Sequence, residues 1–95
     1  LREDHTTHRF EGHDGRIHDL AWSPDGQRVI SVGERGMLKV WNLESGHACN
    51  HVLAHDGPAY SLSLGPSGRY AATGGDDGIV RRWDLWRGVK VDQFE

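Results

Sequence analysis

The chain has 95 residues, 36% hydrophobic residues and a formal net charge of −3, which describes at most one small domain with a thin core. The weak acidity argues against nucleic acid and anionic membrane surfaces as partners, since both select basic faces, and no apolar run approaches the roughly 18 residues of a membrane-spanning helix. Cys49 is the single cysteine, so no disulfide can form within the chain, and we expect a reducing compartment, the cytoplasm.

Short stretches with alternating or β-branched apolar residues, separated by turns that contain Gly or Pro, predict strands along the whole chain. In chain order the predicted strands are 6–11, 17–23, 28–33, 37–43, 48–53, 59–65, 70–74, 79–85 and 89–94. No segment combines a helical apolar stripe with capping residues. The sequence therefore predicts an all-β protein.

The chain also repeats itself: residues 12–53 align with residues 54–95 without a gap, and we call this shift one period. The two copies are identical at 11 positions, mostly Gly, Pro, His and Trp, which are residues that fix turns and large packing sites. Each period contains four predicted strands, and residues 1–11 continue the register upstream. We therefore expect a lone outer strand in residues 1–11, one four-stranded unit in 12–53 and a second in 54–95.

Four strands per period of about 42 residues are typical of the blades of a β-propeller. The chain resembles the WD-repeat family over its whole length. The motifs that carry the resemblance are Gly12-His13, Ser23-Pro24-Asp25-Gly26, Trp41-Asn42-Leu43, His55, Asp76-Asp77-Gly78 and Trp83-Asp84-Leu85. The fold implied is two four-stranded antiparallel propeller blades.

The resemblance implies a buried hydrogen-bonded set of His, Ser or Thr, Asp and Trp in each blade. In the second blade His55, Thr73, Asp77 and Trp83 fill all four positions. In the first blade His13, Ser31 and Trp41 fit, but Arg35 stands where the aspartate belongs. We expect the first blade to be less rigid, because its imidazole lacks an orienting acceptor.

The Ser/Thr–His–Asp grouping also imitates the triad of a hydrolase, in which Ser31 or Thr73 would be the nucleophile. We expect a structural role instead, since oxyanion donors are missing and one copy lacks the aspartate. The seven histidines suggest no metal site within the chain: His47 and His51 fall along one extended stretch, where residues four apart are about 13 Å apart. A metal shared between chains stays open, and no catalytic residue or cofactor is predicted.

Partner contacts in propellers of this family often come from the start of the first strand and from the residue before the turn aspartate. The resemblance places Arg16, His18, Glu34, Tyr60 and Asp76 at these positions. Two tryptophans lie outside the repeated motif. Trp22 is expected in the core, whereas Trp86, where the first blade has Glu44, is either a partner contact or packed on its own chain.

Two blades do not close a propeller, because each blade buries both of its faces against neighbours. Copies of the chain joined head to tail would close a ring of eight blades (a homo-tetramer, favoured) or six (a homo-trimer, next). One copy of the fourth strand, residues 6–11 or 89–94, is then redundant and is expected to be swapped, disordered or irregularly paired. The predicted function is a non-catalytic scaffold for protein or peptide ligands. The alternative is an excised part of a larger signalling or regulatory protein whose enzymatic domain lies elsewhere.

Overall fold

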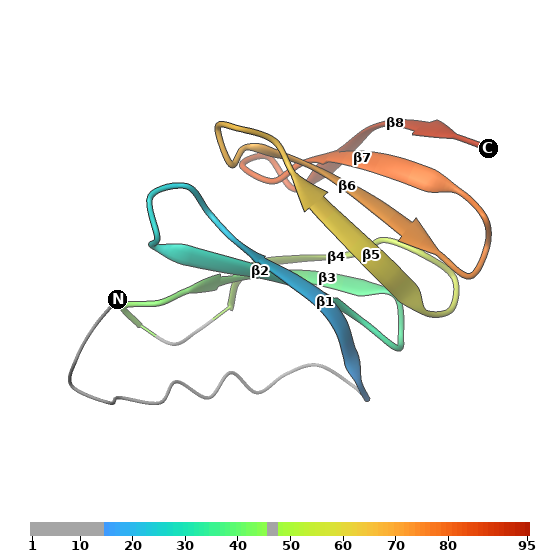
Figure 1. The fold of residues 1–95 in the computed structure, drawn as a ribbon, viewed down its shortest axis with the longest axis horizontal. Coiled ribbons are helices and arrows are strands. Elements are labelled where there is room, and N and C mark those ends of the chain that lie inside the picture. Colours follow the sequence, from blue (N-terminus) through green and yellow to red (C-terminus); the bar gives the residue numbers. More distant parts are fainter. Residues whose placement is uncertain (1–14, 46–47) are drawn as a thin grey trace.

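The computed structural model describes residues 15–45 and 48–95, which form two four-stranded antiparallel sheets (Figure 1). The first sheet contains β1 (Ile17–Trp22), β2 (Arg28–Gly33), β3 (Met37–Asn42) and β4 (Ala48–Leu53). The second contains β5 (Ala59–Leu64), β6 (Tyr70–Gly75), β7 (Val80–Asp84) and β8 (Val89–Phe94). In each sheet the strands are neighbours in chain order, and every predicted strand after residue 14 is present with its ends within one residue. The predicted strand 6–11 lies outside the described residues.

The turn between β1 and β2 shows why these strands pair where they do. The Asp25 carboxylate accepts hydrogen bonds from the Ser23 hydroxyl at 2.6 Å and from the Gln27 backbone N–H at 2.9 Å. The Ser23 hydroxyl oxygen accepts from the Arg28 N–H at 3.0 Å, and Gly26 adopts a positive φ of 74°. The predicted Ser-Pro-Asp-Gly turn therefore closes with its own side chains as partners.

The period of the sequence recurs in the backbone. The register shifts between Ile17 and Asp19 in β1, and it shifts between Ala59 and Ser61, the equivalent pair in β5. A second pair of shifts lies in the third strand of each sheet, at Val40/Trp41 and Arg82/Trp83. The two sheets are thus two copies of one blade, and we call them blade 1 and blade 2.

The core lies between the two blades, which stack face to face with β5 against β1 and β2 (Figure 1). Blade 1 contributes its larger aliphatic side chains and blade 2 mostly smaller ones around one tryptophan. The buried cluster contains Ile30, Val32, Leu38, Val40, Ala54, Ala59, Ala71, Trp83 and Leu85. This is the apolar contact that neither sheet could make alone.

Two hydrogen-bonded contacts fix how blade 2 sits on blade 1. The Asp19 carboxylate in β1 accepts from the Leu62 backbone N–H in β5 at 2.9 Å. The carbonyl oxygen of Gly36, in the turn between β2 and β3, accepts from the N–H groups of Ala54 at 2.7 Å and His55 at 3.2 Å. The segment that enters blade 2 is therefore tied to a turn of blade 1.

The outward faces of both blades expose large apolar side chains. The expectation that Trp22 lies in the core is wrong, since 59% of its surface is exposed. Trp22 pairs with Val29, and both lie on the face of blade 1 that points away from blade 2. Val29 on β2 is only 6% exposed, so the exposure of Trp22 comes from its place on β1, the edge strand of the sheet. Leu20 shares that face, while Val80 and Phe94 are exposed on the outward face of blade 2.

Candidate interaction surfaces and the buried hydrogen-bond network

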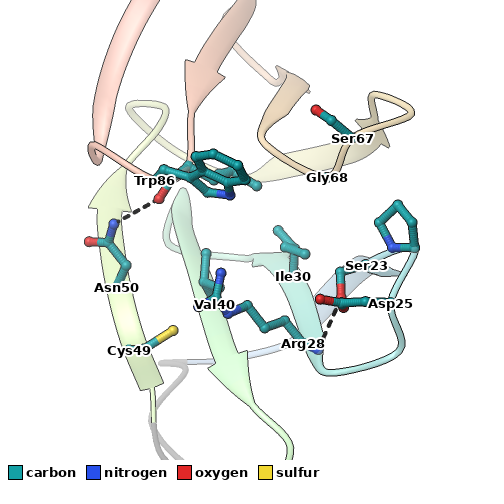
Figure 2. A pocket seen from close by; sticks show the side chains of 12 residues that line it. Ser23, Asp25, Arg28, Ile30, Val40, Cys49, Asn50, Ser67, Gly68 and Trp86 are labelled. Atoms are coloured by element: carbon teal, nitrogen blue, oxygen red, sulfur yellow. Dashed lines mark hydrogen bonds between the residues drawn. The ribbon is translucent and has the colours of Figure 1, made fainter.

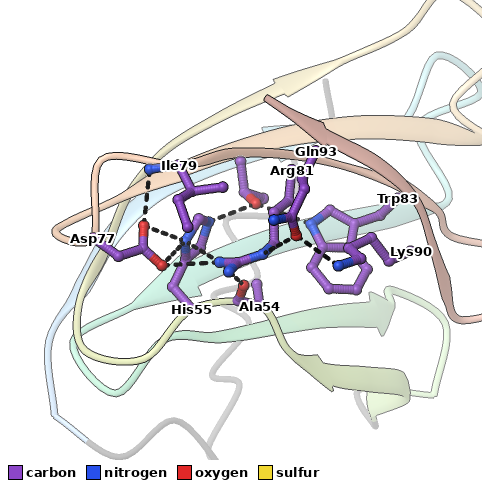
Figure 3. A network of polar contacts seen from close by, with 9 residues as sticks. Ala54, His55, Asp77, Ile79, Arg81, Trp83, Lys90 and Gln93 are labelled. Atoms are coloured by element: carbon purple, nitrogen blue, oxygen red, sulfur yellow. Dashed lines mark hydrogen bonds and ion pairs between the residues drawn. The ribbon is translucent and has the colours of Figure 1, made fainter. Parts of the chain in front are cut away.

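The four positions that the resemblance implies for blade 2 form one connected set (Figure 3). Trp83 donates its indole N–H to the Thr73 hydroxyl at 2.9 Å, and the same hydroxyl lies 2.9 Å from His55 Nε2. His55 Nδ1 lies 3.0 Å from both carboxylate oxygens of Asp77. The set links the segment before β5 with β6, the turn after β6, and β7.

The direction of these hydrogen bonds follows from donor and acceptor chemistry. The Asp77 carboxylate can only accept, so it pairs with a proton on His55 Nδ1, which also lies 2.9 Å from Arg81 Nη1; Nε2 of the ring then accepts. Thr73, which accepts from Trp83, then donates its single hydroxyl proton to Nε2. The chain of donors runs from Trp83 through Thr73 and His55 to Asp77, and it fixes the tautomer of the buried imidazole.

Arg81 is a fifth member of this network, and the sequence did not reveal its role. Its Nη1 donates to Asp77 Oδ2 and to the Ala54 carbonyl, both at 2.9 Å, and its Nε donates to Gln93 Oε1 at 3.3 Å. Burial alone would raise the pKa of Asp77, but hydrogen bonds from Arg81, His55 and the Ile79 N–H outweigh it and hold that pKa well below its ordinary value of 3.8. A single basic residue in a predicted strand carries no sequence signal for these contacts.

In blade 1 the described residues show the tryptophan part of the network. Trp41 donates its indole N–H to the Ser31 hydroxyl at 2.9 Å, and both side chains are buried. His13 lies outside the described residues. Arg35, at the position of Asp77, is exposed. The matched Trp–Ser and Trp–Thr pairs show that the tryptophan half of the set is common to both blades.

Stability should fall when the solution is acidified below about pH 4. Asp77 and Asp84 both have folded-state pKa values below 3.8, the latter mainly because Arg69 donates two hydrogen bonds to its carboxylate. Their contribution to stability is complete above the unfolded-state pKa and is lost as the pH falls through the folded-state value. We expect urea midpoints, measured from pH 7 to pH 2 at constant ionic strength, to decline below pH 4. The Asp77→Asn variant should decline less steeply, and parallel curves would contradict this.

Five of the six predicted partner-binding residues lie at one edge of the blades, which we call the loop edge: Arg16, His18, Glu34, Tyr60 and Asp76. The His18 ring nitrogen Nε2 lies 2.7 Å from Glu34 Oε1, and the His18 and Tyr60 rings meet edge to face with centroids 4.9 Å apart. His18, Glu34 and Tyr60 therefore form one polar and aromatic cluster from both blades. Arg16, Tyr60 and Asp76 are exposed at this edge.

Trp86, the sixth residue, lies at the opposite edge, where β7 turns into β8. Its indole is 61% exposed, and the Arg69 guanidinium lies over the ring, 5.0 Å from its centroid. Arg69 is itself held by two hydrogen bonds to Asp84, at 3.1 and 2.9 Å, and also lies over the Tyr70 ring at 5.2 Å. The sequence did not reveal this stack of Tyr70, Arg69 and Trp86, which holds an exposed aromatic in place.

Trp86 also forms one wall of a groove between the blades, with a volume of about 510 Å³ (Figure 2). Ile30 and Val40 of blade 1 line it, and Asn50 donates to the Leu85 carbonyl at 3.1 Å at one side. The groove therefore runs along the junction of the two blades.

The chemistry that these residues can perform is limited by their burial. Thr73 is 1% exposed, and its hydroxyl is hydrogen-bonded to Trp83 and His55. A substrate therefore has no access to the Thr73 hydroxyl, which cannot act as a nucleophile. Within residues 15–45 and 48–95, no three His, Cys, Asp or Glu side chains gather as metal ligands would. In the same part of the chain no helix has the length and apolar character needed to cross a membrane.

Two stacked four-stranded blades with a Trp–Thr–His–Asp network define a segment of a β-propeller. The family model described as "WD domain, G-beta repeat" matches the chain twice, over residues 4–42 and 47–84. The chain therefore belongs to the WD40 family. Each matched segment ends with the third strand of one blade, and the second segment begins before β4, so it takes in the fourth strand of blade 1.

Curated relatives match over parts of the chain. Polyadenylation factor subunit 2 of Cryptococcus neoformans var. neoformans is 40% identical over 35 residues, which are 37% of this chain and 5% of that protein. The transcriptional corepressor LEUNIG_HOMOLOG of Arabidopsis thaliana is 46% identical over 44 residues, 46% of this chain and 5% of that protein. Periodic tryptophan protein 2 of Saccharomyces cerevisiae is 47% identical over 36 residues, 38% of this chain and 4% of that protein.

Among solved structures, the crystal structure of the RRP9 WD40 repeats superimposes with a TM-score of 0.84. The match covers 90% of this chain and 27% of that one, at 20% sequence identity, and shows the shared fold. The chain thus spans a small part of the proteins that it resembles. WD40 propellers generally act as non-catalytic scaffolds, and the names of the relatives above describe no enzyme.

Proposed function

We propose that this chain is a non-catalytic scaffold for protein–protein contacts, built from an outer strand in residues 1–11 and blades at 12–53 and 54–95. The loop edge, with Arg16, His18, Glu34, Tyr60 and Asp76, would bind protein or peptide ligands, and Trp86 would contribute from the opposite edge. The fixed exposed aromatics support this assignment, because Trp, Tyr and Arg dominate binding hot spots. The burial of Thr73 supports a role without catalysis.

The outward faces of the two blades both expose large apolar side chains. Trp22 is 59% and Phe94 58% exposed, on opposite ends of the two-blade stack. Large apolar side chains exposed on a sheet face are unfavourable in water and are typical of an interface. We propose that further copies of the chain cover both faces head to tail, in a ring of eight blades from four copies, with six blades from three copies as the next choice.

The second candidate is a segment of a larger signalling or regulatory protein, in which other blades of the same polypeptide cover the two faces and an enzymatic domain lies elsewhere. The short alignments favour this candidate, since the matched part is 4–5% of each relative's length. The relatives' names speak of polyadenylation and transcriptional corepression. For this chain we propose protein partners, no nucleic acid or membrane contact, and a reducing compartment, the cytoplasm, consistent with an exposed free Cys49.

Light scattering coupled to size-exclusion chromatography tests the assembly. We expect a discrete species with four times, or three times, the mass of the chain, and a folded signal in far-UV circular dichroism. An unfolded or aggregating chain would support the second candidate, because both faces would then need blades that this polypeptide does not supply. A well-folded monomer at high concentration would contradict both, since neither face would then require cover.

A further inference from the structure

The two outward faces of the chain differ from each other in size and charge, and their differences are matched. We call the face of blade 1 with Ile17, Leu20 and Trp22 the trailing face, and the face of blade 2 with Ala72, Gly74, Val80 and Arg82 the leading face. We infer that the leading face is shaped to receive the trailing face of a second copy of this chain. This inference rests on the proposed self-assembly and names the surfaces and residue pairs that would carry it.

The existing junction between the blades provides the template. There, β2 of blade 1 packs against β5 of blade 2, and the bulky Ile30 and Val32 lie in one cluster with Ala59, while Leu62 and Leu64 pack on it. A large surface of β2 therefore meets a surface of β5 whose first residue is small. The close packing of this junction is what a second junction has to reproduce.

At the corresponding positions of the two outward faces, the leading face has smaller side chains than the existing junction and the trailing face has larger ones. One period after β2, the leading face has Ala72 in place of Ile30 and Gly74 in place of Val32. One period before β5, the trailing face has Ile17 in place of Ala59 and Trp22 in place of Leu64; Leu20 matches Leu62. Volume lost from one surface is thus supplied by the other, as packing across one shared interface requires.

Charge follows the same rule at the groove between the blades. In the existing junction Val40 of blade 1 and Trp86 of blade 2 line the groove. Their counterparts at the open faces are Arg82, one period after Val40, and Glu44, one period before Trp86. An apolar and aromatic pair is therefore replaced by a cation and an anion. Opposite charges that meet in this way select the correct partner face.

The two charged side chains are available for this contact. Arg82 is half exposed and pairs with Asp92 at 2.6 Å on the leading face, which holds its guanidinium against the sheet. Glu44 is exposed, and its backbone N–H donates to Asn42. A second copy would add the Glu44 carboxylate to the Arg82–Asp92 pair, so that one guanidinium serves two carboxylates.

The turn after β6 leaves room for the chain of the next copy. In the existing junction Gly36 accepts from Ala54 and His55, and a Cβ on Gly36 would overlap the His55 and Gly57 carbonyl oxygens. Its counterpart Gly78 has the same backbone, with φ of 75°, but no atom within 4 Å of a Cβ position.

A charge exchange tests the inference on the full chain. Arg82→Glu and Glu44→Arg, made singly, should each weaken assembly about tenfold or more, because each puts like charges opposite one another. The double variant restores opposite charges at every junction and should assemble within about threefold of the parent, judged by analytical ultracentrifugation. Arg87→Glu is the control, since this exposed residue takes the same change in charge at the β7–β8 turn.

Three outcomes are informative. Weakening by both single variants, recovery in the double variant and no effect of Arg87→Glu would support the inference. An assembled parent that responds to neither single variant, or whose double variant fails to recover, would overturn the inference and leave self-assembly in place. A parent that stays monomeric at all concentrations would overturn the inference together with self-assembly, while loop-edge binding could still be measured.

Discussion

Replacing Gly36 with alanine is expected to destabilise the two-blade unit by roughly 3 kcal/mol or more. Gly36 has a φ of 79°, a conformation that costs an L residue about 1–2 kcal/mol. The added Cβ would also overlap the His55 carbonyl oxygen and lie 2.6 Å from the Gly57 carbonyl oxygen, so the segment entering blade 2 would have to move. Urea unfolding of the Gly36→Ala variant, followed by circular dichroism, measures the loss.

Gly78→Ala is the matched control, because it has the same turn position in blade 2 and a φ of 75°. Nothing lies within 4 Å of its Cβ position, so only the backbone strain of about 1–2 kcal/mol is expected. The comparison is made at low protein concentration, where contacts between copies do not contribute. Equal losses for the two variants would show that the contact of Gly36 with the entry segment is unimportant.

Replacing Trp83 with alanine is expected to cost about 3–5 kcal/mol, which is a large part of the stability of a small domain. Trp83 is 6% exposed in the cluster between the blades, and its indole N–H satisfies the Thr73 hydroxyl. The substitution leaves a cavity and also removes the first donor of the buried network. The readout is the free energy of unfolding from urea titrations.

Trp86→Ala provides the comparison for this effect. Trp86 is 61% exposed, so the same truncation removes little buried surface and should change stability by about 0.5 kcal/mol or less. Trp83→Phe separates packing from hydrogen bonding, because it keeps most of the volume and loses the N–H. A loss from Trp83→Ala no greater than that from Trp86→Ala would contradict the assignment of Trp83 to the core.

The strands and their order could be predicted because the relevant signals are local and occur twice. Turn residues such as Pro24 and Gly26 close a hairpin through contacts with residues adjacent in the sequence. The same residue types recur one period later, which shows that the turn pattern is repeated. His55, Thr73 and Asp77 could be placed together because the resemblance supplied their roles. The structure then gave the distances that assign donors and acceptors.

What could not be predicted depends on contacts between segments far apart in the chain. The apolar strand around Trp22 predicts a core position, but β1 is an edge strand, and Trp22 is exposed although its pairing partner Val29 on β2 is buried. Arg81 was missed because a single basic residue in a strand gives no sign of the carbonyl and carboxylate it will meet. The stack of Arg69 on Trp86 likewise joins two turns of blade 2.

The carboxylate of Asp19 has a consequence for how the chain resists misassembly. Among the described strands, β1 and β5 each pair with one strand and leave their other edge unpaired. An unpaired strand edge offers backbone N–H groups with which another extended peptide can pair. In β5 the N–H of Leu62 is already taken by Asp19, so a foreign strand would have to displace a charged side chain to pair there. Amyloid-like growth should therefore start elsewhere among the described strands, at the free edges of β1, β4 and β8.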